Sequence, residues 1–174
     1  MATKKSTWVL FGILVISAWM LGSAIQVGAE TLNFKFYSYA IQNESAPIGD
    51  VEGHNVVLIN RRAFCVFENG EVATEVYVTT GDYIKGSGSS TQYRTITFSD
   101  GSTIILKVQI TVTGSAQGVT ASTKATREII KGTGRFEGIK GTGASSSKFL
   151  PLEKGEVGPK QIGEGTITYT LPSK

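Results

Sequence analysis

The chain of 174 residues has few of the residue types on which many reactive sites depend. It contains one cysteine, Cys65, and one histidine, His54. A single cysteine cannot form an internal disulfide, so burial of apolar groups must hold the fold together. Cys65 lies within AFCVF, and we expect a buried small hydrophobic residue rather than a nucleophile. One histidine makes no metal site, so we predict no metal and no cofactor.

The sequence also lacks a strong excess of charge of one sign. It has 17 basic and 14 acidic side chains, a net charge of +3. Two of the basic residues, Lys4 and Lys5, belong to the N-terminal segment, and without them the balance is 15 against 14. The remaining basic residues are spread along the chain. This balance excludes a protein that binds nucleic acid or an acidic membrane surface through an excess of positive charge.

One long hydrophobic run is present, from Trp8 to Leu21, directly after the two lysines. Small residues follow, and Val27–Ala29 places short side chains at both positions that a signal peptidase tests. We predict that residues 1–29 are a signal peptide cleaved after Ala29, with cleavage after Ala24 as second choice. The protein would then be periplasmic or secreted, with no stable membrane anchor. The alternative is an uncleaved anchor helix, because the segment from Trp8 to Val27 is just long enough to span a bilayer.

Residues 30–174 lack helical periodicity and instead alternate between apolar and polar residues, as strands do. Asn69-Gly70 and Asp100-Gly101 are strong hairpin signals, whereas residues 81–90 and 149–159 read as loops. The expected strands are 32–41, 54–67, 71–80, 91–98, 102–113, 119–130, 131–143 and 165–172. We predict one all-β domain, a closed antiparallel eight-stranded up-and-down barrel of calycin-like form, just wide enough to hold one small ligand.

Two adjacent arginines, Arg61 and Arg62, interrupt an apolar strand. Strand alternation sends them to opposite faces, and both faces are otherwise apolar. Three explanations remain open. An arginine lies inside the barrel with a carboxylate partner, for which Glu128 is a candidate. A second subunit covers the outer face. A bulge exposes both residues.

The glycine-rich stretch KGTGRFEGIKGTG, residues 131–143, suggests either a phosphate loop or a strand that bends. The glycine spacing differs by one residue from the dinucleotide motif, and no helical pattern follows to supply a helix N-terminus. We therefore expect a flexible barrel strand in which Phe136 and Ile139 pack on apolar surface. Arg135, Glu137 and Lys140 would be solvated.

The same stretch resembles a late glycine-rich strand of the allene oxide cyclase barrel and the related dirigent proteins. The positions that match are Gly134, Phe136, Glu137, Gly138 and Gly141. Chain length, the export signal and the FSDGSTI hairpin fit bacterial members of this group, and the likeness covers roughly Leu32 to Leu171. It implies an eight-stranded barrel, and it includes no catalytic residue of either family.

Three functions follow from this reading. The first is a barrel that binds a small, largely apolar molecule in or at the mouth of its lumen. The second, implied by the resemblance, is an isomerase or cyclase of the allene oxide cyclase type, with Arg62, Tyr93 and Glu128 as candidate catalytic residues in the lumen. The third is a dirigent-like or structural assembly protein that forms a trimer-like homo-oligomer. Asn43-Glu44-Ser45 matches a glycosylation sequon, which matters only in a source that glycosylates.

Overall fold

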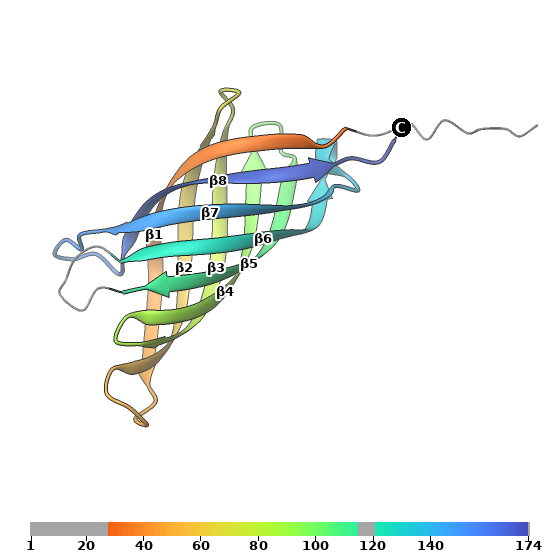
Figure 1. The fold of residues 1–174 in the computed structure, drawn as a ribbon. Helices are drawn as coiled ribbons and strands as arrows, with labels where there is room; N and C mark the ends of the chain where they lie inside the picture. The colour runs from red at the N-terminus through yellow and green to blue at the C-terminus, as the bar shows by residue number, and fades with distance from the viewer. Residues whose placement is uncertain (1–27, 115–120, 174) are drawn as a thin grey trace, which may run out of the picture.

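The structure is a computed structural model that describes residues 28–114 and 121–173. Within them lie eight strands and one 3-10 helix: β1 (Glu30–Pro47), β2 (His54–Phe67), β3 (Val72–Ile84), β4 (Ser87–Phe98), β5 (Thr103–Thr113), β6 (Ser122–Thr133), η1 (Gly134–Phe136), β7 (Lys140–Leu150) and β8 (Lys160–Thr170). The strands pair antiparallel in chain order, and β8 pairs with β1, so the sheet closes on itself (Figure 1). The prediction of a closed eight-stranded up-and-down barrel is confirmed.

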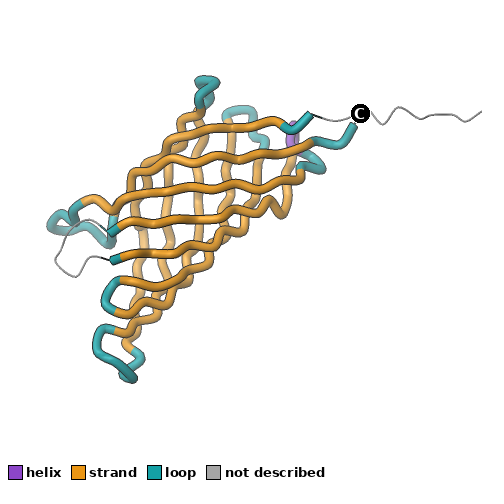
Figure 2. The backbone as a smooth tube through the Cα atoms, viewed as in Figure 1, coloured by secondary structure: helices purple, strands orange, loops and turns teal. Residues whose placement is uncertain are grey.

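Short turns over residues 68–71, 85–86 and 99–102 join β2 to β5, whereas residues 151–159 form a longer connection between β7 and β8 (Figure 2). Both predicted hairpin turns are present, with Gly70 and Gly101 at φ values of 85° and 81°. The predicted loop over 81–90 is wrong, because β3 and β4 continue through it to a tight turn at Lys85 and Gly86. The glycines there serve close packing rather than a loop: a Cβ on Gly88 would lie 2.0 Å from the backbone oxygen of Asp82.

The glycine-rich stretch 131–143 contains the end of β6, the connection through η1 and the start of β7, so its prediction as a single bent strand is wrong. β6 ends at Thr133, η1 turns the chain, and β7 begins at Lys140. Gly132 permits this reversal, because a Cβ there would lie 2.2 Å from the backbone oxygen of Phe136. The predicted burial of Phe136 and Ile139 is confirmed. The stretch therefore reverses the chain beneath an aromatic cap.

The seventh strand is β7, which includes the serine-rich segment ASSSKFL. Its inward residues from Gly141 to Ser147 are glycine and serine, whereas Phe149 lines the lumen. A Cβ on Gly141 would lie 2.1 Å from the backbone oxygen of Thr168, so this small residue lets β7 pack closely beside β8. The Thr123 and Ser147 hydroxyls, which both face the lumen, lie 2.7 Å apart. Serine thus fills inward positions that a search for apolar alternation passes over.

One end of the barrel is closed by an apolar plug. Ring centroids lie 5.5 Å apart for Phe34 and Phe67, 5.2 Å for Phe67 and Phe98, and 4.9 Å for Phe98 and Phe136. Arg135 lies over the last two rings, 4.8 Å from each centroid, and an oxygen of Glu71 lies 2.6 Å from its guanidinium. Tilted aromatic contacts, cation–π contacts and an ion pair therefore close the end at which η1 lies.

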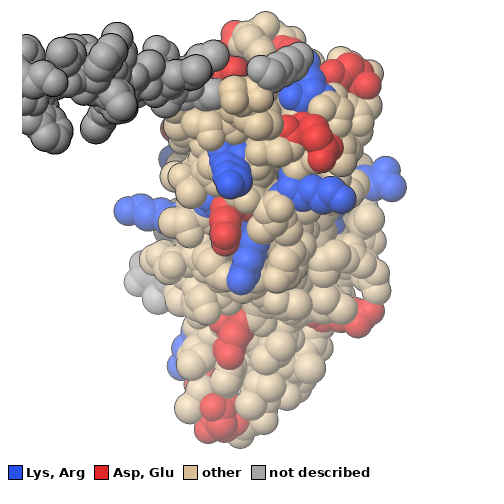
Figure 3. Space-filling view, turned by 90° about the vertical axis from the view of Figure 1, so that its right-hand side faces the viewer, with Lys and Arg blue, Asp and Glu red and all other residues tan. Residues whose placement is uncertain are grey.

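The outer surface carries charges of both signs. On the face drawn in Figure 3, basic and acidic side chains are interspersed, and no field of one sign covers it. Among the residues that the structure describes, no helix is long and apolar enough to cross a membrane. The predicted signal peptide lies almost wholly in residues 1–27, outside the described part of the chain.

Candidate functional site

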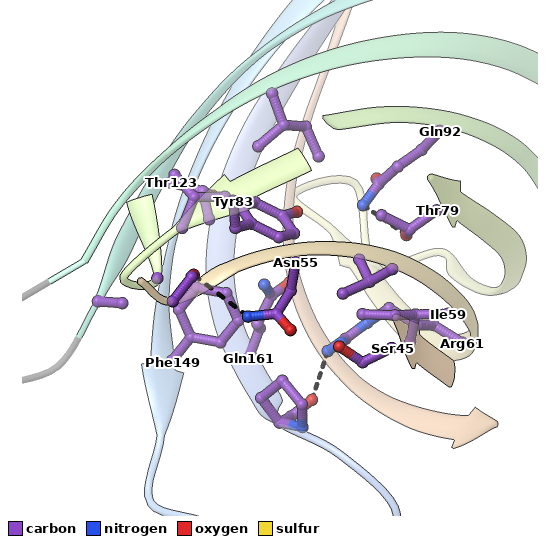
Figure 4. A pocket seen from close by; sticks show the side chains of 17 residues that line it. Ser45, Asn55, Ile59, Arg61, Thr79, Tyr83, Gln92, Thr123, Phe149 and Gln161 are labelled. Atoms are coloured by element: carbon purple, nitrogen blue, oxygen red, sulfur yellow. Dashed lines mark hydrogen bonds between the residues drawn. The ribbon is translucent and has the colours of Figure 1, made fainter. Parts of the chain in front are cut away.

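The end of the barrel opposite the plug contains a cavity of about 380 Å³ (Figure 4). Residues of the β1–β2, β3–β4 and β7–β8 connections line it, together with Ala121, which directly precedes β6. Its apolar lining consists of Val57, Ile59, Ile110, Val112, Ala121, Phe149 and Pro159. Its polar lining includes Asn55, Arg61, Thr79, Tyr83, Gln92, Thr123 and Gln161. The volume lies in the range of small-molecule sites, and the lining combines apolar walls with a few polar groups.

Arg61 extends from β2 into the lumen, and its side chain is among those labelled in Figure 4. Its Nε donates to the Tyr77 hydroxyl at 3.1 Å. Its Nη2 donates to Ser38 Oγ at 3.2 Å and to the Pro159 carbonyl at 2.7 Å. The residue is only 3% exposed, and all three acceptors are neutral. The lumen therefore holds one arginine of the adjacent pair, which answers the question left open by the sequence.

A charged cluster lies between the cavity and the plug. Glu75 on β3 accepts a hydrogen bond from Arg94 Nη1 at 3.0 Å, and its other oxygen lies 3.6 Å from Arg127 Nη1. Arg94 also donates to the side-chain oxygen of Gln92. Among the described residues, Glu75 Oε1 and both Nη groups of Arg127 have no hydrogen-bond partner. Glu75, and not the predicted Glu128, is the carboxylate that lies beside arginines inside the barrel.

The two arginines of this cluster respond differently to burial. Desolvation, followed by the positive charge of Arg94, lowers the pKa of Arg127 to about 10. Desolvation also acts to lower the pKa of Arg94, but the charge and hydrogen bond of Glu75 outweigh it, so that pKa is raised. Both groups remain cationic at neutral pH. In the described part of the chain, the interior therefore contains three cations, Arg61 included, and one carboxylate.

Cys65 is fully buried beside this cluster, as predicted. Burial, followed by the charge of Glu75, raises the pKa of its thiol to about 12. A thiol in this state is a poor nucleophile, because the thiolate is the reactive form. Cys65 is therefore a packing residue.

His54 lies at the rim of the open end, between two carboxylates. Its Nδ1 lies 2.5 Å from Asp50 Oδ1, and its Nε2 lies 2.8 Å from Asp82 Oδ1. These hydrogen bonds, with Asp50 first, raise the pKa of His54 and favour the charged imidazolium. This triad of Asp50, His54 and Asp82 links the β1–β2 connection to β3.

The three candidate catalytic residues, Arg62, Tyr93 and Glu128, are exposed on the outside of the barrel. Their predicted place in the lumen is wrong, and in each case the error is one residue. The neighbours Arg61, Arg94 and Arg127 are the side chains that point inward. Because strand side chains alternate, an error of one position moves a side chain to the other face.

A signal for the correct parity was present in the sequence. Arg94 lies an even number of positions from Ile96 and Phe98, so its side chain points to the same face of β4 as these apolar residues. Arg127 shares a face of β6 with Ala125 and Ile129 in the same way. Glu75 was not predicted to be buried, because it lies on the less apolar face of β3. The other face carries Val72, Val76 and Val78, and these valines suggested that it faces the core, whereas they are exposed. The site offers cationic and neutral hydrogen-bond donors beneath apolar walls.

No model of a known protein family matches the sequence. No curated protein matches it either. Among solved structures, the pterocarpan synthase dirigent protein GePTS1 is similar, with a TM-score of 0.51 and 16% identity over 83% of this chain and 92% of that chain. For the pterocarpan synthase dirigent protein PsPTS1 the TM-score is 0.45 and the identity 16%, over 84% and 97% of the two chains. The chain therefore has the closed eight-stranded barrel fold of the dirigent proteins, which confirms at the level of the fold its resemblance to the allene oxide cyclase and dirigent barrels.

Proposed function

We propose that this barrel binds a small, largely apolar molecule in the cavity at its open end. The observation that carries the proposal is the difference between the two ends. Closely packed aromatic rings fill one end, whereas the other keeps a cavity of about 380 Å³ with apolar walls. Burial of apolar ligand surface at about 25 cal/mol per Å² supports micromolar to millimolar affinity for a ligand of modest size.

A titration with octanamide, a neutral amphipathic probe, tests this proposal. Ile59 points into the cavity and Leu58, its neighbour on β2, points outward. We expect Ile59→Trp to fill the cavity and abolish octanamide binding, and the matched control Leu58→Trp to leave binding unchanged. Calorimetry measures both. Binding that survives Ile59→Trp, or that Leu58→Trp alone removes, would place the probe outside the cavity and contradict the proposal.

No observation favours the isomerase or cyclase alternative. It relied on Arg62, Tyr93 and Glu128 meeting in the lumen, and all three face outward. The fold likeness to dirigent proteins is a likeness of backbone and assigns no reaction to this chain.

A homo-oligomer is proposed on a separate observation, the apolar outer face of adjacent strands. Its exposed members are Tyr37, Val56, Leu58, Phe64, Val66, Val72, Val76, Val78 and Ile162. An exposed apolar patch of this kind is typical of a protein interface. Light scattering on the purified protein tests the proposal: we expect a trimer-like mass that Phe64→Glu reduces to that of one chain. A wild-type monomer would contradict it.

Export is also a proposal, supported by the position of the first strand. β1 begins at Glu30, directly after the predicted cleavage position at Ala29. Sequencing the N-terminus of protein recovered outside the cytoplasm is expected to give Glu30 as first residue. An intact Met1 in the membrane fraction would instead support the anchor helix.

A further inference from the structure

The lumen carries an excess of positive charge that the chain itself does not neutralise. Among the residues that the structure describes, the buried ionic side chains are Arg61, Arg94, Arg127 and Glu75. The single carboxylate lies beside Arg94 and Arg127 and is not bonded to Arg61. The interior therefore holds two more cations than anions. Burying a charge without a counter-charge is costly, so a site of this kind favours an external anion.

This charge balance includes every acidic side chain of the protein. All 14 aspartates and glutamates lie within residues 28–114 and 121–173, which the structure describes. None of these carboxylates forms an ion pair with the Arg61 guanidinium. At the nearby rim, Asp50 and Asp82 bind His54, and Glu52 pairs with Lys85 at 3.2 Å. Each of these rim carboxylates therefore contacts His54 or Lys85 rather than Arg61, with Asp50 and Asp82 sharing one imidazole.

Arg61 is the cation that the cavity reaches. It is a lining residue, whereas Arg94 and Arg127 lie deeper and do not line the cavity. Nε and Nη2 of Arg61 bond to neutral acceptors, and Nη1 has no hydrogen-bond partner among the described residues. The neighbouring Gln92 is committed, since it donates to Thr79 and accepts from Arg94. The Nη1 group of Arg61 therefore remains available to donate to a molecule in the cavity.

We infer that the cavity takes a small amphipathic anion, with its carboxylate on Arg61 and its apolar body against Val57, Ile59, Ile110 and Val112. A carboxylate matches a guanidinium donor in geometry and charge, and an ion pair in a site shielded from water is stronger than one at the surface. This inference rests on the proposed function and names the class of ligand for the same cavity.

Calorimetry with three probes of equal chain length tests the inference on the wild-type protein: octanoate, octanamide and octyltrimethylammonium. We expect octanoate to bind at least tenfold more tightly than octanamide, and the cationic probe not to bind. Equal affinities for octanoate and octanamide would overturn the carboxylate assignment and leave the proposed function standing. No binding of either probe would overturn both.

Two variants assign the effect to a side chain. Arg61→Met is expected to remove the preference for octanoate over octanamide. Arg61→Lys, which keeps the charge, should retain part of it. The exposed neighbour Arg62→Met is the matched control and should leave the preference unchanged. A preference that survives Arg61→Met, or that Arg62→Met removes, would place the anion elsewhere. The comparison of probes on wild-type protein tests the ligand class even if a variant does not fold.

Discussion

Replacing Glu75 by glutamine removes the single carboxylate from the barrel interior. The side chain is 1% exposed and keeps nearly the same volume after the change. Arg94, hydrogen-bonded to Glu75 at 3.0 Å, would lose its counter-ion, and Arg127, 3.6 Å away, would lose the nearest negative charge. Three buried cations would remain with no anion between them.

The magnitude follows from the cost of leaving a buried charge unpaired. Breaking a buried ion pair by removing one partner costs about 3–5 kcal/mol of unfolding free energy. A domain of this size loses about 2–4 °C of Tm per kcal/mol, so Glu75→Gln should lower Tm by roughly 6–20 °C. A folded domain has only about 5–15 kcal/mol in total, so the variant would be close to unfolding.

Urea unfolding followed by circular dichroism measures this loss without the screening that guanidinium salts bring. Glu128→Gln is the matched control, because it removes a carboxylate from the outer face, and we expect a change within about 0.5 kcal/mol. In double-mutant cycles Glu75 should couple more strongly to Arg94 than to Arg127, since only Arg94 is hydrogen-bonded to it. A loss for Glu75→Gln no greater than for Glu128→Gln would show that the Glu75 carboxylate does not stabilise the buried arginines.

Three further predictions follow from the cap, the thiol and the rim. Phe136→Ala should destabilise the barrel by about 3–5 kcal/mol in urea unfolding, because it empties the cap of the closed end, and a loss below about 1 kcal/mol would contradict that role. Cys65 should not react with a thiol-specific disulfide reagent in the native state and should react in urea, whereas rapid native labelling would refute its burial. The pKa of His54 is raised above 6.5, so its stabilising effect should be complete below about pH 6.5 and disappear as pH rises through the folded-state pKa. His54→Gln should therefore lower the urea midpoint at about pH 5.5 and change it much less at about pH 9. Equal losses at both pH values would contradict the triad.

The fold could be predicted because its determinants are local. Alternation along β5 and the glycines after Asn69 and Asp100 fix strands and hairpins within a few residues of themselves. Phe136 was also predicted correctly as a buried residue, since a lone aromatic among glycines has few other places to pack. Residues 144–150 of β7 were not predicted as strand, because the inward positions Ser145 and Ser147 are small and polar rather than apolar.

The site residues could not be predicted because they depend on parity and on distant strands. Arg61 and Arg62 are equivalent by composition, and only pairing with β1 and β3 decides which one is enclosed. Glu75 and Arg127 are 52 positions apart in the sequence and meet only because the barrel closes. A buried charge cluster that joins separate strands leaves no local pattern.

A methyl NMR titration of the protein with octanoate and octanamide tests most directly whether the cavity inside the barrel binds a ligand. We expect at least one probe to shift the methyl signals of Val57, Ile59, Ile110 and Val112 at the open end and to leave those of Ile104, Leu106 and Ile167 in the plugged end unchanged. Shifts confined to outer-face methyls such as Val66 and Val76, or no shifts with either probe, would contradict a binding cavity inside the barrel.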